Sequence, residues 1–310
     1  MTNFSRPDIA VVEGIALDHL DQNSDVAGQA VWSITDGIES YPCLVPSADL
    51  VMALRGRLLF RHAFQLATWP VNGGAREKPV AVLVAAQSIP DLDDPLRFLP
   101  ASLCPVKGVV AGTIELIRQI DSTPLRCIVE RVFLRRDVTA SFWTMPASAR
   151  HHHAVPGGLA LHSLEVAQDL ARHGALTECE RDLCIAAGLL HDVGKVWSYT
   201  PDMFQTKEAQ AVGHELLGLS RLHDELAMLG TEWPDGAHAM RALLSGSTRM
   251  RQNGSMPSAL VARLKAADQR SCERDRHGRD PSGSWVPGAW AGGPAVAQRL
   301  QSLGVEDEIF

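Results

Sequence analysis

From about residue 106 onward, apolar residues recur at intervals of three and four, which is the spacing of one helix face. This pattern predicts helices over residues 108–120, 124–136, 159–173, 177–192, 214–229, 240–245 and 258–272. Gly174 is placed to end one of these helices, and Thr177 with Glu180 has the spacing of a capping box at the start of the next. We therefore expect this part of the chain to be helical throughout.

The first hundred or so residues have shorter and more mixed patterns. Two apolar runs within residues 29–45 predict a β-hairpin, and residues 79–86 predict a buried strand. Residues 50–69 fit a helix and a strand equally well, and residues 1–28 are weakly periodic and expected to be poorly ordered. A mixed α/β region follows from this, with a small β-barrel as one form that it can take.

A segment with four prolines, residues 88–105, separates the two patterns and predicts a loop or linker. We expect a mixed α/β region of unknown role over residues 1–105 and a helical domain over residues 106–275. Residues 276–310 are rich in Gly, Pro and Trp and are expected to form a loop with a short helix over 295–303. The predicted fold class is mainly α, and a length of 310 residues suits roughly two domains.

The formal net charge of -7 argues against a generally basic nucleic-acid binder, but one segment departs from the average. Residues 241–279 hold nine basic and three acidic residues, so a local basic face could attract phosphate groups. A solvated helix surface explains the same charges equally well. Arg249 and Arg251 are our candidates for substrate contacts in this segment.

The six cysteines form no CxxC pair, a pattern that suits a reducing compartment. The first residues lack the pattern of a signal peptide, and the longest aliphatic run is too short to span a bilayer. We expect a cytoplasmic protein without a membrane partner.

Histidine and aspartate side chains that could bind a metal lie on or beside the inward faces of three predicted helices. His162 shares a face with apolar neighbours, His191 and Asp192 follow the next buried helix, and Asp268 lies on the apolar stripe of a late helix. A single inward histidine is more commonly a hydrogen-bonded core residue than a ligand. A buried carboxylate, however, needs a partner, and a divalent cation held by the histidines supplies one. Two imidazoles and two carboxylates suit Mn first, with Fe, Ni, Co or Zn as alternatives and Mg less suited.

This order of residues resembles the HD superfamily of metal-dependent phosphohydrolases. The segments "PASARHHHAVPGGLALHSLEVA" and "AAGLLHDVGKVW" are similar to the HD domains of two groups. One group is the H-type (TraI-like) conjugative relaxases, which "AADQRSCERD" resembles more closely. The other is a bacterial 3′-to-5′ exoribonuclease family that joins a small nucleic-acid-binding barrel to its HD domain. The resemblance covers roughly residues 124–276.

The resemblance implies that His162, His191, Asp192 and Asp268 are the metal ligands. It also aligns His214 with the first additional histidine of members that hold two metals. The next histidine of that set is missing, because the chain has "LLSGST" at the matching place and His238 lies about two turns too early. His214 is therefore a ligand of a second metal, a contact to substrate or to another ligand, or a histidine that merely starts a helix.

Three further residues are candidates for contact with substrate. Lys195 could bring a positive charge to a phosphate, although an exposed lysine after a helix is the plainer interpretation. His152 could bind substrate and His153 could donate a proton to a leaving oxygen, unless both only pack against the preceding turn. Asp192 is expected to orient the attacking water as well as to bind the metal.

Three functions remain in competition. The first is a phosphodiesterase or nuclease acting on nucleic acid in DNA processing or mobile-element transfer, with DNA-transfer proteins as partners. The second is a phosphohydrolase of nucleotides or other small phosphate esters. The third is a non-catalytic module for nucleic-acid binding or assembly that retains the HD fold.

Overall fold

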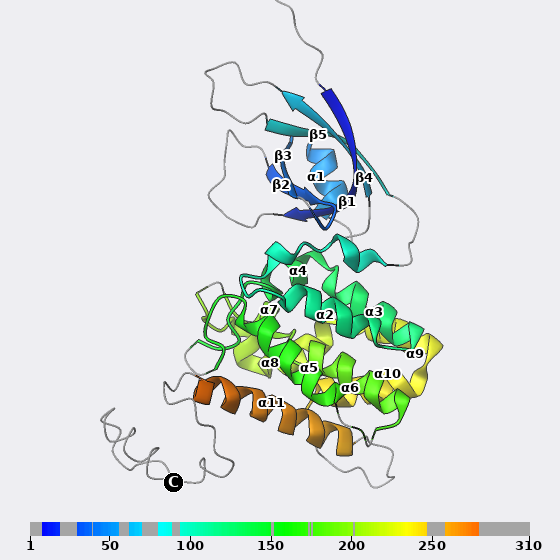
Figure 1. Cartoon of the computed structure of the whole chain (residues 1–310), viewed down its shortest axis with the longest axis vertical. Coiled ribbons are helices and arrows are strands. Elements are labelled where there is room, and N and C mark those ends of the chain that lie inside the picture. The colour runs from blue at the N-terminus through cyan, green and yellow to red at the C-terminus, as the bar shows by residue number, and fades with distance from the viewer. Residues whose placement is uncertain are drawn as a thin grey trace, which may run out of the picture.

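The computed structural model describes residues 8–18, 30–38, 40–55, 62–69, 80–88, 94–149, 152–172, 174, 176–200, 202–246 and 258–278. In this part of the chain, a small barrel precedes a larger helical body (Figure 1). The prediction of a mainly α protein with a mixed N-terminal region is confirmed, and that region does form a barrel.

Five strands close the barrel in the order β1-β2-β3-β5-β4. They are β1 (Asp8–Asp18), β2 (Ala30–Thr35), β3 (Ser40–Val45), β4 (His62–Trp69) and β5 (Val80–Ser88), and α1 (Ala48–Arg55) lies between β3 and β4. Only the β3–β5 pair is parallel among these pairings. Trp32 and Ile34, two positions apart on β2, are fully buried and form the barrel core with Leu83 and Leu54.

The predicted hairpin is confirmed as β2 and β3, which pair from Ala30↔Val45 to Thr35↔Ser40. Its turn is held by the Thr35 hydroxyl, which accepts from the amide of Gly37, and by Asp36, which accepts from the amide of Ile38. The ambiguous segment 50–69 contains both alternatives, since α1 ends at Arg55 and β4 begins at His62. The strand expected over 79–86 is β5.

One expectation for the N-terminal residues was wrong. Residues 8–18 are not poorly ordered but form β1, which pairs with β2 on one side and with β4 on the other. Apolar and polar residues do not alternate cleanly in this segment, because both of its edges and one of its faces are buried only when the barrel closes. The rest of residues 1–28 lies outside the described residues.

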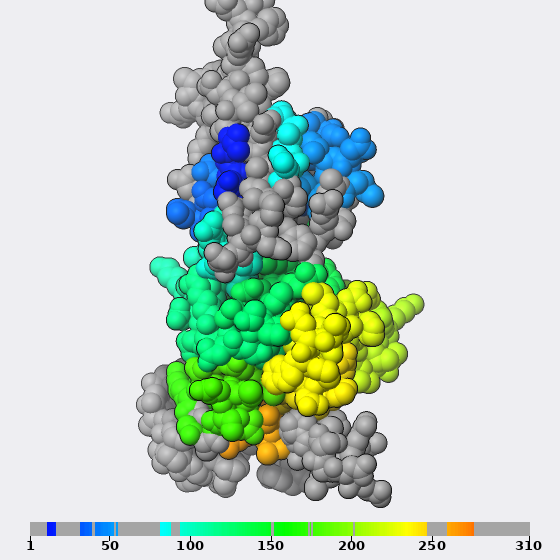
Figure 2. Space-filling model, turned by 90° about the vertical axis from the view of Figure 1, so that its right-hand side faces the viewer, coloured from blue at the N-terminus to red at the C-terminus, as the bar shows by residue number. Residues whose placement is uncertain are grey.

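The helical body packs ten helices around a single apolar cluster within the described residues. Their bounds are α2 (Val109–Arg118), α3 (Thr123–Phe133), α4 (Arg136–Phe142), α5 (Gly158–Ala171), α6 (Glu178–Leu190), α7 (Lys195–Ser198), α8 (Lys207–Arg221), α9 (His223–Glu232), α10 (Pro234–Leu244) and α11 (Ser258–Gly278). Figure 2 shows α9 and α10, in yellow tones, beside the green part of the chain that includes α3 and α6. The predicted capping box is confirmed, because Thr177 accepts from the amide of Glu180 and Glu180 accepts from the amide of Thr177.

The segment between the barrel and the helical body is more structured than a linker. Two short 3-10 helices, η1 (Pro95–Phe98) and η2 (Ala101–Leu103), replace the expected loop. Leu96, Phe98 and Leu99 are buried in the apolar cluster of the helical body, together with Ile15 of β1. The barrel is therefore joined to the helical body by shared apolar packing, which fixes it at the end of the body that carries η1 and α4 (Figure 1).

Two expected features lie outside the described residues. These are the helix over 295–303 and the basic positions Arg249 and Arg251. Among the described residues, no helix combines the length and apolar character that a bilayer crossing requires.

Candidate metal centre

The loop before α5 folds tightly over the start of that helix. Gly157 caps α5 with a φ of 79°, a conformation that favours glycine. A Cβ on Gly158 would lie 1.9 Å from the carbonyl oxygen of His153, so only glycine allows the loop to approach this closely. That carbonyl accepts a hydrogen bond from the amide of Ala147. The glycine pair thereby holds His152 and His153 against the helix that carries His162.

A second close approach brings α8 next to the end of α6. His191 caps α6, and its amide donates to the carbonyl of Ala187 at 2.8 Å. A Cβ on Gly194 would lie 2.0 Å from the carbonyl oxygen of His214, so α8 packs directly on the turn that follows Asp192. The structure therefore places His214 beside Asp192.

Four of the residues predicted as metal ligands converge. The Nε2 atoms of His162 and His191 are 3.3 Å apart, and Oδ1 of Asp268 lies 3.0 Å from the former and 4.0 Å from the latter. Oδ2 of Asp192 lies 3.6 Å from each of these two nitrogens. The ligand atoms of His162, His191 and Asp268 all lie within 4.8 Å of one another.

Hydrogen bonds on the far side of each imidazole orient its lone pair toward this centre. His191 Nδ1 lies 2.9 Å from the carbonyl oxygen of Gly188, which can only accept, so this nitrogen carries the hydrogen. Nε2 of the neutral ring is then an acceptor. Burial lowers the pKa of His191, which favours this neutral form.

His162 is oriented by a longer chain of partners. Ser271 donates its hydroxyl hydrogen to Glu165 Oε2 at 2.7 Å and lies 3.0 Å from His162 Nδ1. Because its hydrogen is committed to Glu165, the hydroxyl accepts from His162 Nδ1–H and leaves Nε2 with a lone pair. The burial of His162 is complete.

The donor set therefore fits a cation. Two imidazole lone pairs and two carboxylates meet at one point, and neighbouring groups already hold the outer nitrogens of both rings. Without positive charge between them these electron-rich atoms repel one another. Nitrogen and oxygen ligands in this combination suit a divalent transition metal.

Asp192 is held by two basic side chains, one on each oxygen. Lys195 Nζ lies 2.6 Å from Oδ2 and also donates to the carbonyl of Ala147, while His214 Nε2 lies 3.1 Å from Oδ1. Burial acts to raise the pKa of Asp192, but its basic neighbours, above all the charge of Lys195, hold that pKa well below its usual value. For Lys195, burial acts to lower the pKa, but the charge and hydrogen bond of Asp192, together with the charge of Asp268, raise it above its usual value. The two groups thus form a buried ion pair.

The predicted substrate contacts Lys195 and His153 lie inside the protein. Lys195 is 8% exposed and His153 is 1% exposed. His153 Nε2 lies 3.3 Å from Glu165 Oε2, and its amide donates to Asp275 of α11. Both side chains are therefore buried and have protein partners.

His152 is half-buried at the edge of the centre, with its ring centroid 5.2 Å from that of His162. Burial is the largest cause that lowers its pKa to about 4, so its ring is neutral at physiological pH. Its backbone is tied to Ser148 through both the amide and the carbonyl.

The remaining candidates are distributed differently. His214 is near Asp192 but belongs to no group of three ligand atoms among the described residues, and His238 is exposed on α10. Arg249 and Arg251 lie outside the described residues. The structure therefore brings together His162, His191, Asp192, Asp268 and His214, with His152, His153 and Lys195 around them.

Sequence reasoning missed three residues of the centre: Glu165, Ser271 and Cys272. A signal for them was present, since Glu165 is three residues after His162, and Ser271 and Cys272 are three and four residues after Asp268. Those spacings place each of them on the helix face of a predicted ligand.

Comparison with known proteins identifies this part of the chain. Residues 159–271 match the HD domain and form one. The chain is 34% identical over 98 residues to the 3'-5' exoribonuclease YhaM of Listeria monocytogenes serotype 4b (strains CLIP80459 and F2365) and of serovar 1/2a (strain EGD-e). This match spans 29% of the chain and 31% of each relative, so less than a third of the length of these curated relatives is covered. No solved structure matches the chain. Both matches support a hydrolase of the HD type.

Proposed function

We propose that this protein is a metal-dependent phosphodiesterase that acts on nucleic acid. The observation that carries the proposal is the convergence of His162 Nε2, His191 Nε2 and Asp268 Oδ1, with Asp192 Oδ2 beside them. The domain that holds them is similar to part of proteins named as exoribonucleases, which supports a phosphodiester substrate.

His162, His191, Asp192 and Asp268 are the residues that would hold the cation, which we expect to be Mn, Fe, Co, Ni or Zn rather than Mg. When bound, such a cation polarises a phosphoryl oxygen and supplies hydroxide near neutral pH. The four side chains come from α5, α6, the turn after it and α11, so the fold of the helical body itself positions them.

The residues around the centre hold charge and protons in place. Lys195 keeps the Asp192 carboxylate ionised and fixes its orientation, and this role replaces the contact with a substrate phosphate that we expected for Lys195. His153 acts through Glu165 and Ser271 on the orientation of His162 instead of donating a proton to the substrate. His214 is 25% exposed and bonded to Asp192, so it is our candidate for moving a proton at the reacting group.

The barrel supports nucleic acid as the substrate. Its strand order β1-β2-β3-β5-β4, with a helix between β3 and β4, is that of the five-stranded Greek-key barrels of the OB type. Barrels of this type bind oligonucleotides across their second and third strands and adjoining loops. We propose that the barrel holds the polymer and that Arg249 and Arg251 add phosphate contacts. A role in DNA transfer rests on the likeness of three sequence segments to relaxases and remains a proposal.

Hydrolysis assays with Mn-loaded protein on single-stranded RNA, single-stranded DNA and mononucleotides test this function. We expect a single-stranded polymer to be cleaved by the wild type and by His238→Ala, a control that changes an exposed histidine. The double variant His191→Ala, Asp192→Ala should be inactive. Cleavage of mononucleotides alone would replace the proposal with the small-ester alternative. Absence of turnover with every divalent metal would instead support a non-catalytic module.

A further inference from the structure

We propose that Cys272 and His152 are additional ligands of the metal centre and give it a sulfur-containing side. This inference rests on the proposed function, because it needs a cation at His162, His191, Asp192 and Asp268. It goes further by assigning the chemical class of that cation, which is a metal with affinity for thiolate.

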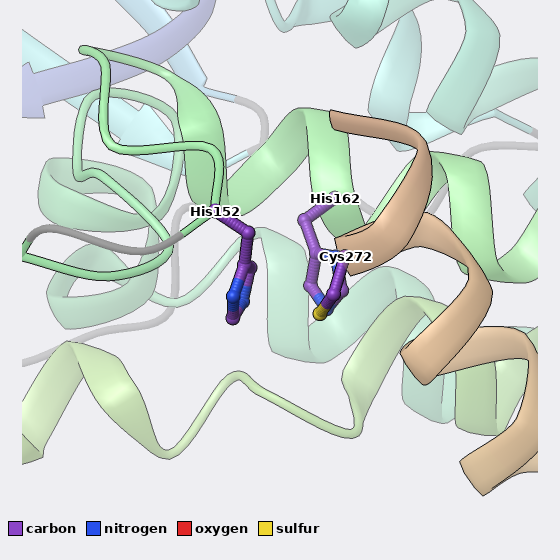
Figure 3. A group of neighbouring side chains, drawn as sticks. All are labelled: His152, His162 and Cys272. Atoms are coloured by element: carbon purple, nitrogen blue, oxygen red, sulfur yellow. The ribbon is translucent and has the colours of Figure 1, made fainter. Parts of the chain in front are cut away.

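The ligand atoms of His152, His162 and Cys272 all lie within 4.8 Å of one another. Figure 3 shows the three side chains, which reach the same place from the loop before α5, from α5 and from α11. His162 belongs to this group and also to the group with His191 and Asp268. One imidazole is thus shared, so the two groups are adjacent sides of one centre.

Cys272 lies one helical turn after Asp268 on the same face of α11. Its side chain is buried, and its thiol is 3.7 Å from Asp268 Oδ1, a contact in which sulfur is a weak donor. A cation that replaced the thiol hydrogen would exchange this weak bond for a direct thiolate–metal bond. The thiol is therefore placed where a bound metal is expected.

The other five cysteines provide the contrast. Cys43, Cys104 and Cys184 are also buried, and Cys127 and Cys179 are exposed. Among the described residues, none of these five belongs to a group of three possible metal ligands. Cys272 differs from them in its neighbours rather than in its burial.

The backbone of His152 is held in place beside the centre. Its backbone amide and carbonyl are both bonded to the Ser148 hydroxyl, which holds the loop in place. No hydrogen bond to its ring nitrogens is found within the described part of the chain, and its ring packs 5.2 Å from the ring of His162. A half-buried imidazole with unused nitrogens next to a buried thiol is suited to bind a metal.

A thiolate changes which metals bind. Soft sulfur ligands favour Zn, Fe and Co, whereas Mg takes oxygen ligands almost exclusively. With sulfur in the set, we expect Zn and Co to be bound in strong preference to Mg, and thiol-directed metals such as Cd to compete with them.

Spectra of the full-length protein loaded with Co(II) test the inference. A thiolate bound to Co(II) gives an intense near-ultraviolet charge-transfer band that nitrogen and oxygen ligands do not give. We expect this band in the wild type and in Cys184→Ser, a matched control that changes a buried thiol outside the group. The band should disappear in Cys272→Ser, and its position should shift in His152→Ala.

Metal affinity provides the second measurement. Cys272→Ser should weaken Zn binding by at least about 10-fold, which is the typical effect of losing a hydrogen-bond partner of a metal ligand. Binding of Mg should be unchanged. Circular dichroism and thermal unfolding of each variant separate this loss from a loss of fold.

The possible failures are distinguishable. Wild-type protein that binds Co(II) without a thiolate band, or a band that survives in Cys272→Ser, would overturn this inference and leave the proposed function intact. Wild-type protein that binds no divalent metal at all would overturn both.

Discussion

Ser271 decides which nitrogen of His162 faces the centre. Its hydroxyl hydrogen is committed to Glu165, so it can only accept from His162 Nδ1. Partners of this kind fix the tautomer of a ligating histidine and raise its basicity. His153, bonded to the same carboxylate, is the last member of the chain.

Ser271→Ala should therefore weaken metal binding by about 10–100-fold without unfolding the protein. The remaining ligands stay in place, but His162 is free to turn or to change its tautomer. Isothermal titration with Zn or Mn measures the effect, and Ser220→Ala, at an exposed position of α8, is the control. Equal affinities for the wild type and Ser271→Ala would show that this chain of bonds has no bearing on metal binding.

Lys195 and Asp192 form a buried pair in which each charge compensates the other. Removing one partner leaves a buried charge unpaired, which costs about 3–5 kcal/mol. Lys195→Met should lower the free energy of unfolding of the metal-free protein by that amount, measured by urea denaturation.

Lys265→Met, at an exposed position of α11, should leave the stability nearly unchanged. If Lys195→Met were as stable as this control, the buried pair would contribute nothing to the fold. Addition of metal should restore part of the lost stability in Lys195→Met, because the cation then compensates Asp192.

At the level of elements, the close crossing of α5 and α6 sets the distance between His162 and His191. A Cβ on Gly188 would lie 2.7 Å from Cα of Ala167, so the two helix backbones touch at this point. His191 follows Gly188 by three residues and bonds to its carbonyl. A change at Gly188 is therefore transmitted directly to a ligand.

We expect Gly188→Ala to destabilise the protein by about 1–3 kcal/mol through overpacking and to weaken metal binding as well. Gly174→Ala is the matched control, since a Cβ at that position meets nothing within 4 Å. Urea denaturation and metal titration of both variants check the prediction. If Gly188→Ala were as stable as the wild type, α5 and α6 could move apart at this crossing without loss of stability, which would contradict the prediction.

The sequence allowed most helices of the helical body to be predicted because they carry apolar stripes. It did not predict α4 and α7, and the single helix expected over residues 214–229 is divided between α8 and α9. His162, His191, Asp192 and Asp268 could be predicted on the same basis, since each lies on or beside such a stripe. The spacing of Glu165 and Ser271 places them on the ligand faces of α5 and α11, but the bond between them could not be predicted. It joins residues 106 positions apart and depends on how α11 packs on α5. The burial of Lys195 escaped prediction for the same reason, since its partner Ala147 comes from another segment.

β1 escaped prediction for a reason of tertiary structure. Its apolar and polar residues alternate only weakly. Its partners come from other parts of the chain, since β2 is the next strand and β4 lies further along. A strand whose two edges are satisfied only in a closed barrel leaves little local signal. The choice between helix and strand over residues 50–69 had no single answer, because a helix and a strand both form there.

For the whole molecule, the barrel and the helical body share apolar packing through Ile15, Leu96 and Phe98. A polymer bound on the barrel would therefore be held at a fixed distance from the metal centre. Binding of this kind depends on phosphate contacts and weakens as salt rises.

We predict that the double variant Arg249→Ala, Arg251→Ala binds single-stranded DNA or RNA with a shallower salt dependence than the wild type. Each phosphate contact contributes about 0.7 to the slope of log affinity against log salt for single strands, so loss of both should lower the slope by about 1.4. The double variant Arg118→Ala, Arg221→Ala removes two arginines that are paired with carboxylates and is the control. Equal slopes for all three proteins would show that residues 249 and 251 do not contact phosphate.

The metal content of purified protein tests the central claim most directly. After loading with Mn or Zn and removal of free metal, elemental analysis should find stoichiometric metal in the wild type and none in His191→Ala, Asp192→Ala. Wild-type protein without metal, or a double variant that retains its full metal content, would contradict the assignment of these residues as the metal centre.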